Sequence, residues 1–293
     1  MPKEKQKTIW KYIGYVLLTL VLIVYFFLLT FPIEALKDHY LSRSAGRLPY
    51  RIAVEHIRTT PFLWVNCSGL EISGKSKNAS PPLVAFETLK LRPAWLKLLM
   101  GQPALRLNGI LYSGKIKGMA GKKKDDVDIS LAWKDIELAD YPLLTAMNLG
   151  QMKGALSGKF LLRMNQNRWY AGDGTLTCQL EEGSFKELKV RGFSLPTLEG
   201  IAGQGVLRLG QQKATLESFT INSNQLSSAF DGKIDLKPEI TRSRLNLNGK
   251  VKLIGEMADQ YQPMLSGLLR NKDDQDFYTF SLKGSLSKPR FSF

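Results

Sequence analysis

The sequence predicts a mainly β protein: a single N-terminal transmembrane helix followed by a long, curved, mostly antiparallel sheet with a few short helices. Three features of the 293-residue chain support this fold class. An uncharged run of twenty residues lies near the N-terminus. Stretches that alternate apolar and polar residues dominate from residue 51 onward, and a short phrase containing glycine recurs within them.

The uncharged run spans Tyr12–Phe31, and as a helix it would be about 30 Å long, which matches the hydrocarbon core of a bilayer. A cleaved signal peptide has a shorter apolar region, usually about 7–15 residues, before a small-residue cleavage site, and "TFPIEALKDHY" contains no such site. Because lysines precede the run, the positive-inside rule places the N-terminus in the cytoplasm. We therefore expect a cytoplasmic stub (1–11), a signal anchor (12–31), a linker (32–50) and an exported β-rich domain (51–293).

The alternating stretch "LNLNGKVKL" (245–253) places a glycine on its apolar face, where a core side chain is expected. The same phrase recurs as "YSGKI", "LSGKF", "FDGKI", "LNGKV" and "LKGSL". Its glycines are candidate groove-facing or curvature residues: Gly114, Gly158, Gly232, Gly249 and Gly284. Such glycines allow a strand to bend, allow another backbone to approach or keep a concave face open for a ligand. The alternative is that they mark bulges in an ordinary packed sandwich.

Only short helices are expected between the strands. The stretch 92–101 has Pro93 near its start and Gly101 at its end, and 140–150 has the same arrangement with Pro142 and Gly150. A third stretch, 256–270, contains Pro263, which predicts a split or a kink. Residues 119–128 are expected to form a charged loop and residues 167–174 a turn.

The net charge of +15 favours anionic partners such as membrane surfaces, acidic glycolipids or nucleic acid. A simpler interpretation is that lysines solvate the polar faces of strands, as alternation predicts for Lys233, Lys237, Lys250, Lys252 and Lys283. Nucleic-acid binding is not expected, because the aromatic residues alternate with apolar ones inside strands, as in "FYTFSL" (277–282).

Motifs for catalysis, cofactors and metals are missing, so we predict that the chain is not an enzyme and has no cofactor, metal or catalytic residues. The two histidines fit no triad or metal spacing. The stretch "GLEISGKS" (69–76) matches a phosphate-binding loop, yet Pro81 and Pro82 follow where that loop requires a helix. Cys67 and Cys178 are equally compatible with one long-loop disulfide and with buried free thiols.

Three segments carry a resemblance to a known family: "PFLWVNCSGLEIS" (61–73), "LKLRPAWLKLLMGQPALRLNGILYSGKIKG" (89–118) and "FSLKGSLSKPRFSF" (280–293). With the anchor and the glycine-punctuated strands, they resemble periplasmic AsmA-like proteins and, more closely, the type II secretion system protein N family (GspN). The resemblance implies an AsmA-like open groove or half-closed barrel, and a single-pass protein of the bacterial inner membrane with its bulk in the periplasm. It brings no catalytic residues.

Two functions follow as expectations. The first is a non-enzymatic scaffold, a component or accessory of the type II protein secretion system that contacts other secretion-system or envelope proteins. Its candidate partner-binding edge is Phe280, Leu282, Leu286, Phe291 and Phe293. The second is an AsmA-like module that binds or transfers phospholipid, as implied by AsmA-like relatives and favoured by glycines on an apolar face.

Overall fold

A computed structural model gives the fold. It describes residues 50–60, 64–74, 82–141, 151–165, 168–186, 189–190, 193–194, 197–239, 242–269, 271–286 and 288–292, and five isolated positions between residues 15 and 26. Most of the predicted membrane anchor, the linker and the expected helix at 140–150 lie outside these residues. Among the residues described, no helix is both long and apolar enough to cross a membrane.

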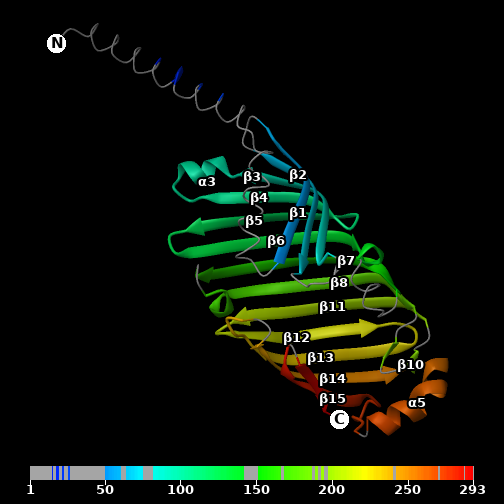
Figure 1. Cartoon of the computed structure of the whole chain (residues 1–293). Helices are drawn as coiled ribbons and strands as arrows, with labels where there is room; N and C mark the ends of the chain where they lie inside the picture. Colours follow the sequence, from blue (N-terminus) through cyan, green and yellow to red (C-terminus); the bar gives the residue numbers. More distant parts are fainter. Residues whose placement is uncertain are drawn as a thin grey trace, which may run out of the picture.

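The described chain forms one 14-stranded antiparallel sheet whose strands follow one another in sequence order (Figure 1). Its strands are β1 (Tyr50–Thr59), β2 (Val65–Gly74), β3 (Val84–Pro93), β4 (Ala104–Leu111), β5 (Gly114–Lys123), β6 (Asp126–Glu137), β7 (Gln151–Asn165), β8 (Asp173–Lys186), β11 (Leu198–Gly210), β12 (Lys213–Asn222), β13 (Leu226–Asp235), β14 (Arg244–Leu253), β15 (Tyr278–Ser285) and β16 (Lys288–Ser292). A second, two-stranded sheet pairs β9 (Lys189–Val190) with β10 (Phe193–Ser194). The prediction of a mainly antiparallel β fold is confirmed.

Two of the described hairpins turn through two residues whose φ is positive: Tyr112 and Ser113 (46° and 61°) between β4 and β5, and Gln211 and Gln212 (52° and 61°) between β11 and β12. This conformation matches the right-handed twist of the paired strands. The phrase "YSGKI" therefore begins in a turn, and Gly114 is the first residue of β5. The charged loop expected over 119–128 is wrong, because the two strands there pair up to Lys123 and Asp126 and leave a two-residue turn. The opposite charges of that pair favour the extended hairpin.

The ladder is curved rather than flat. In Figure 1 β1 runs steeply across strands that lie nearly horizontal, although β1 connects to them through β2 and β3. A register shift between Phe86 and Thr88 separates β3 from β4, and further shifts interrupt the β6–β7, β7–β8, β8–β11, β11–β12 and β12–β13 pairings. Because each bulge bends its strand and increases the local twist, repeated bulges give the curvature that the sequence predicted.

Two α-helices interrupt the described strands. α3 (Trp95–Leu99) lies inside the stretch predicted to be helical over 92–101. α5 (Glu256–Leu268) is one continuous helix that contains Pro263, so the predicted split does not occur. Pro263 is on the exposed side of α5. The carbonyl that loses its helical hydrogen bond there faces water, which lowers the cost of proline within a helix.

The packed core is small and lies at one end of the sheet. Leu198, Ile201 and Met257 form a buried cluster that joins β11 to α5. Partly buried side chains complete it: Leu180, Phe185, Ile221, Leu226, Leu253 and Tyr261. Elsewhere each described strand makes its extensive contacts with its neighbours in the ladder. Among the described residues, most of the sheet is therefore a single layer.

Candidate functional site

One face of the sheet carries a continuous row of small and apolar residues, one from each strand between β1 and β15. Each member is paired with the next across the ladder. We call this set the apolar row: Ile57, Cys67, Leu89, Gly109, Ile116, Trp133, Gly158, Cys178, Gly205, Phe219, Phe230, Gly249 and Phe280. Most members are only half-buried, since no second layer of comparable extent covers them among the described residues. The row is therefore an apolar surface that is only partly accessible: nine of its thirteen members are half-buried, four are buried and none is exposed.

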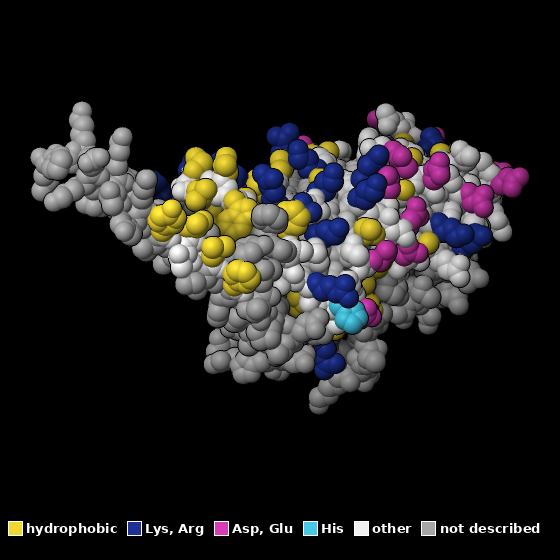
Figure 2. Space-filling view, turned by 90° about the horizontal axis from the view of Figure 1, so that it is seen from above, with side chains coloured by type: hydrophobic (Ala, Val, Ile, Leu, Met, Phe, Trp, Pro, Cys, Tyr) yellow, Lys and Arg dark blue, Asp and Glu magenta, His cyan; other side chains and the backbone are white. Residues whose placement is uncertain are grey.

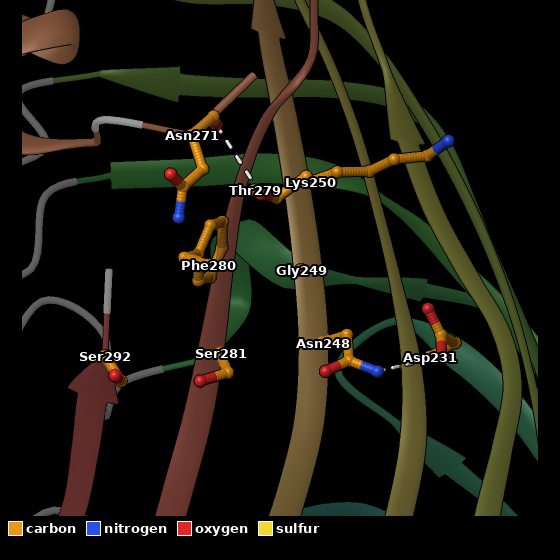
Figure 3. A pocket seen from close by; sticks show the side chains of 9 residues that line it. All are labelled: Asp231, Asn248, Gly249, Lys250, Asn271, Thr279, Phe280, Ser281 and Ser292. Atoms are coloured by element: carbon orange, nitrogen blue, oxygen red, sulfur yellow. Dashed lines mark hydrogen bonds between the residues drawn. The ribbon is translucent and has the colours of Figure 1, made fainter. Parts of the chain in front are cut away.

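Gly249 shows why the row contains glycine. It is paired with Phe230 on one side and Phe280 on the other, and a Cβ at this position would lie 2.5 Å from Cζ of Phe280. Figure 3 shows Phe280 on the side of β14 away from Asn248 and Lys250. The centroids of the Phe230 and Phe280 rings are 5.8 Å apart although a whole strand separates them. Glycine lets the two rings meet across the strand, a favourable edge-to-face arrangement.

The same pairing of ring and glycine recurs along the row. The Trp133 ring lies over Gly158, and the Phe219 ring lies 2.7 Å from the position a Cβ on Gly205 would take. The aromatic centroids continue from Phe219 to Phe230 at 6.0 Å and from Phe280 to Phe291 at 6.2 Å. Aromatic rings thus form much of the accessible surface in this half of the sheet.

The register places all five predicted glycines on the apolar face, but their surroundings differ. Gly158 and Gly249 lie under aromatic rings. A Cβ on Gly114 would meet the backbone of Ile136, and one on Gly232 would meet the backbone of β14. Gly284 is paired with Leu245 and has a φ of 109°. The approach of another backbone, one of the alternatives left open by the sequence, explains Gly114 and Gly232, whereas aromatic rings, which the sequence did not predict, explain Gly158 and Gly249.

The predicted partner-binding edge covers two strands, and only the second of them is the edge of the sheet. Phe280 and Leu282 belong to β15, which is paired on both sides, so they are not edge residues. Phe291 is on the edge strand β16 and is 51% exposed, and Leu286 is exposed where β15 ends. Phe293 lies outside the described residues. β16 is only five residues long and contains proline and two cations, features that discourage pairing with another strand.

The opposite face of the sheet is polar and basic. Alternation correctly assigned Lys233, Lys250, Lys252 and Lys283 to it, whereas Lys237 is exposed just after β13. Another row on this face contains four cations, Arg58, Lys90, Lys117 and Lys159, separated by uncharged residues. One face of the ladder is therefore mainly apolar, and the other is mainly polar and basic.

Hollows occur where side chains of neighbouring strands diverge. One of about 490 Å³ is lined by Gly249 and Phe280 together with polar residues (Figure 3). A second, of about 350 Å³, lies beside Gly158, Cys178 and Gly205. Both are shallow and combine members of the apolar row with polar side chains.

Cys67 and Cys178 are both free thiols, which decides between the two alternatives left open by the sequence. Burial raises the pKa of the Cys67 thiol. Burial also raises the pKa of Cys178, a shift reduced by the hydrogen bond its thiol donates to the Gly205 carbonyl. Burial makes the charged thiolate less favourable in the folded chain than in the unfolded chain. The free energy of unfolding is therefore fully kept below the ordinary thiol pKa of about 8.5 and falls as the pH rises above it.

We expect both thiols to react severalfold more slowly with an alkylating reagent in the folded chain than in urea, because the thiolate is the nucleophile. The rate at Cys178 alone is measured in a Cys67→Ser variant at neutral pH. Equal rates in the folded and unfolded chains would contradict the burial of Cys178.

The described residues contain no cluster of metal ligands. No group of three His, Cys, Asp or Glu residues there could hold a metal ion. His56 is exposed on β1, and His39 lies outside the described residues. The described part of "GLEISGKS" belongs to β2, as expected for a strand rather than a phosphate-binding loop.

Fold and site together define a class of protein: an open, single-layer antiparallel sheet with one apolar and one basic face. No protein-family model, curated protein or solved structure matches this chain. Sequence reasoning missed Gly205 and the aromatic partners of the glycines. The signal for Gly205 was present, since it alternates with Leu207 and Leu209 in "GQGVLRLG".

Proposed function

We propose that this chain is a membrane-anchored, non-enzymatic protein of the bacterial envelope whose open sheet binds the acyl chains of phospholipid along the apolar row. The observation that carries the proposal is that row, which crosses thirteen strands without a covering layer among the described residues. A soluble protein rarely leaves so long a contiguous apolar surface uncovered, and such a surface marks a binding site.

The dimensions of the sheet suit this ligand. Strands in a sheet are about 4.8 Å apart, so the fourteen-stranded ladder extends about 60 Å along the hydrogen-bonding direction. The hydrocarbon core of a bilayer is about 30 Å thick, so one acyl chain spans about 15 Å. Several chains could therefore lie along the row, packed on rings and aliphatic side chains rather than in empty space above the glycines.

The test is photo-crosslinking in bacterial cells with a photoreactive amino acid placed in the full chain. We expect a probe at Phe230, in the apolar row, to form adducts with phospholipid that mass spectrometry identifies. The matched control is Asp231, the next residue of β13, which lies on the polar face and should form few lipid adducts. Equal lipid labelling at the two positions would contradict binding along the row.

A second candidate is the scaffold of the type II secretion system, supported by the resemblance to the protein N family. The exposed ring of Phe291 on the edge strand offers a surface for a protein partner. In this proposal a photoreactive amino acid at Phe291 crosslinks to secretion-system proteins in cells. Adducts with copies of the same chain alone would count against it.

A further inference from the structure

The short helix α3 exposes its apolar side chains to solvent and directs its lysine toward the sheet. Leu96, Leu99 and Met100, on α3 and at its C-cap, are 78%, 84% and 68% exposed. Lys97 is less exposed than these three, and its Nζ lies 3.6 Å from Sδ of Met119 on β5. A surface helix normally turns its apolar side chains toward the core and its charges toward water. Here the lysine turns toward the sheet and the leucines toward solvent.

The exposed apolar surface extends beyond these three side chains. Together they form what we call the α3 tip: Trp95, Leu96, Leu98, Leu99, Met100 and Leu105, all exposed. Figure 2, seen from the side on which α3 lies in Figure 1, shows hydrophobic side chains gathered at one end of the molecule with Lys and Arg side chains beside them. Contiguous exposed apolar side chains of this kind mark a contact surface.

Cations lie next to the α3 tip. The chain returns from α3 into β4 at Ala104, which is paired with Gly121, and the Lys122 amide donates a hydrogen bond to the Pro103 carbonyl. This contact brings the β5–β6 turn, with Lys122, Lys123 and Lys124, beside the return from α3. Asp125 and Asp126 follow in the same turn, while Arg92 and Arg106 lie opposite each other on β3 and β4. Cations therefore outnumber acids around the tip.

We propose that the α3 tip inserts into the surface of a phospholipid bilayer that contains anionic lipid. Leucine, methionine and tryptophan side chains that enter the interface, next to lysines that reach headgroup phosphates, are the composition of interfacial membrane contacts. The charge around the tip favours this occupant over an apolar protein surface. The contact lies outside the apolar row and does not depend on lipid binding there.

The chain is long enough for the α3 tip to contact the same membrane that holds the predicted anchor. The eighteen residues 32–49 can span at most about 60 Å. β1 covers a further distance of about 30 Å to Thr59, which is paired with Val65 and through it with Leu91, close to the start of α3. The α3 tip therefore lies at the far end of β1 from the linker and remains within reach of the bilayer surface.

The experiment places an environment-sensitive fluorophore on single cysteines in the full chain, reconstituted in vesicles of phosphatidylcholine and phosphatidylglycerol. Both native cysteines are replaced by Ser, and Leu99→Cys carries the probe. We expect its emission to shift to shorter wavelength and to be quenched by lipids with brominated acyl chains. The matched control is Leu286→Cys, an exposed leucine at the opposite end of the ladder, which should show neither effect.

Charge is tested separately with Lys123→Gln and Lys124→Gln in the labelled chain. Each lysine near an anionic surface contributes about five-fold to binding, so the docked fraction should fall accordingly and depend less on salt. The proposal is overturned if the Leu99→Cys probe behaves like the Leu286→Cys probe, which would instead indicate a protein partner for the tip. Failure of lipid crosslinking at Phe230 would leave this result unchanged, so the two proposals are tested independently.

Discussion

Replacing Ile201 by Ala is expected to lower the free energy of unfolding by about 2–5 kcal/mol. Ile201 is only 6% exposed and packs with Leu198 and Met257, where α5 closes over β11. Since most of the described sheet has no second layer, this cluster contributes an unusually large part of the hydrophobic stabilisation. The measurement is urea unfolding of the full chain in mild detergent, followed by circular dichroism.

The matched control is Ile254→Ala. Ile254 follows β14 directly, precedes α5 and is 39% exposed, so removing the same atoms leaves little cavity. We expect this variant to cost less than about 1 kcal/mol. Similar costs at the two positions would mean that the cluster of β11 and α5 does not anchor the fold.

Much of the architecture could be predicted because it depends on local pattern. Period-two alternation identified the strands, and the proline and glycine of 92–101 marked α3. The failures came from local signals that tertiary structure overrides. The lysines and aspartates of 119–128 indicated a loop, but Lys123 paired with Asp126 across two strands supports a hairpin. Pro263 indicated a split or a kink; the helix is not split, and on the exposed side of α5 the missing donor costs little.

The candidate site was predicted only in part, because it depends on register. The parity of Gly249 with Leu247 and Val251 placed it on the apolar face, and the structure agrees. That Phe280 covers this glycine could not be read from the sequence, since 31 positions and α5 separate them. For the same reason the predicted edge included residues of β15 as well as of the true edge strand β16, because counting paired strands requires the order of the whole ladder.

The α3 tip shows a different limitation. The proline and glycine of 92–101 predicted a short helix but not the surroundings of its side chains. The five-residue helix directs Lys97 toward β5, and its leucines remain exposed. An amphipathic pattern shows that a helix has an apolar face. Whether that face contacts the protein or the solvent depends on how the neighbouring segments pack.

Gly232→Ala is expected to destabilise the fold more than Gly249→Ala, although both glycines lie on the apolar face. Gly232 has a φ of 136°, a conformation that costs other residues about 1–3 kcal/mol. An added Cβ would also meet the backbone of Asn246 and lie 2.7 Å from Cα of Leu247. Backbone paired in a central strand cannot move aside, so the two costs add. Urea unfolding of both variants measures the difference.

At Gly249 an added Cβ would meet a side chain rather than backbone. A second substitution that shortens this side chain should therefore restore part of the lost stability. Overpacking against the Phe280 ring is expected to cost about 1–3 kcal/mol in Gly249→Ala. In a Phe280→Leu background the same change should cost clearly less, because the smaller side chain leaves room for the methyl group. Gly232→Ala should lower the free energy of unfolding by the same amount in that background as in the native chain. If Phe280→Leu relieved both variants equally, or neither, the ring would not be the reason that this strand carries a glycine.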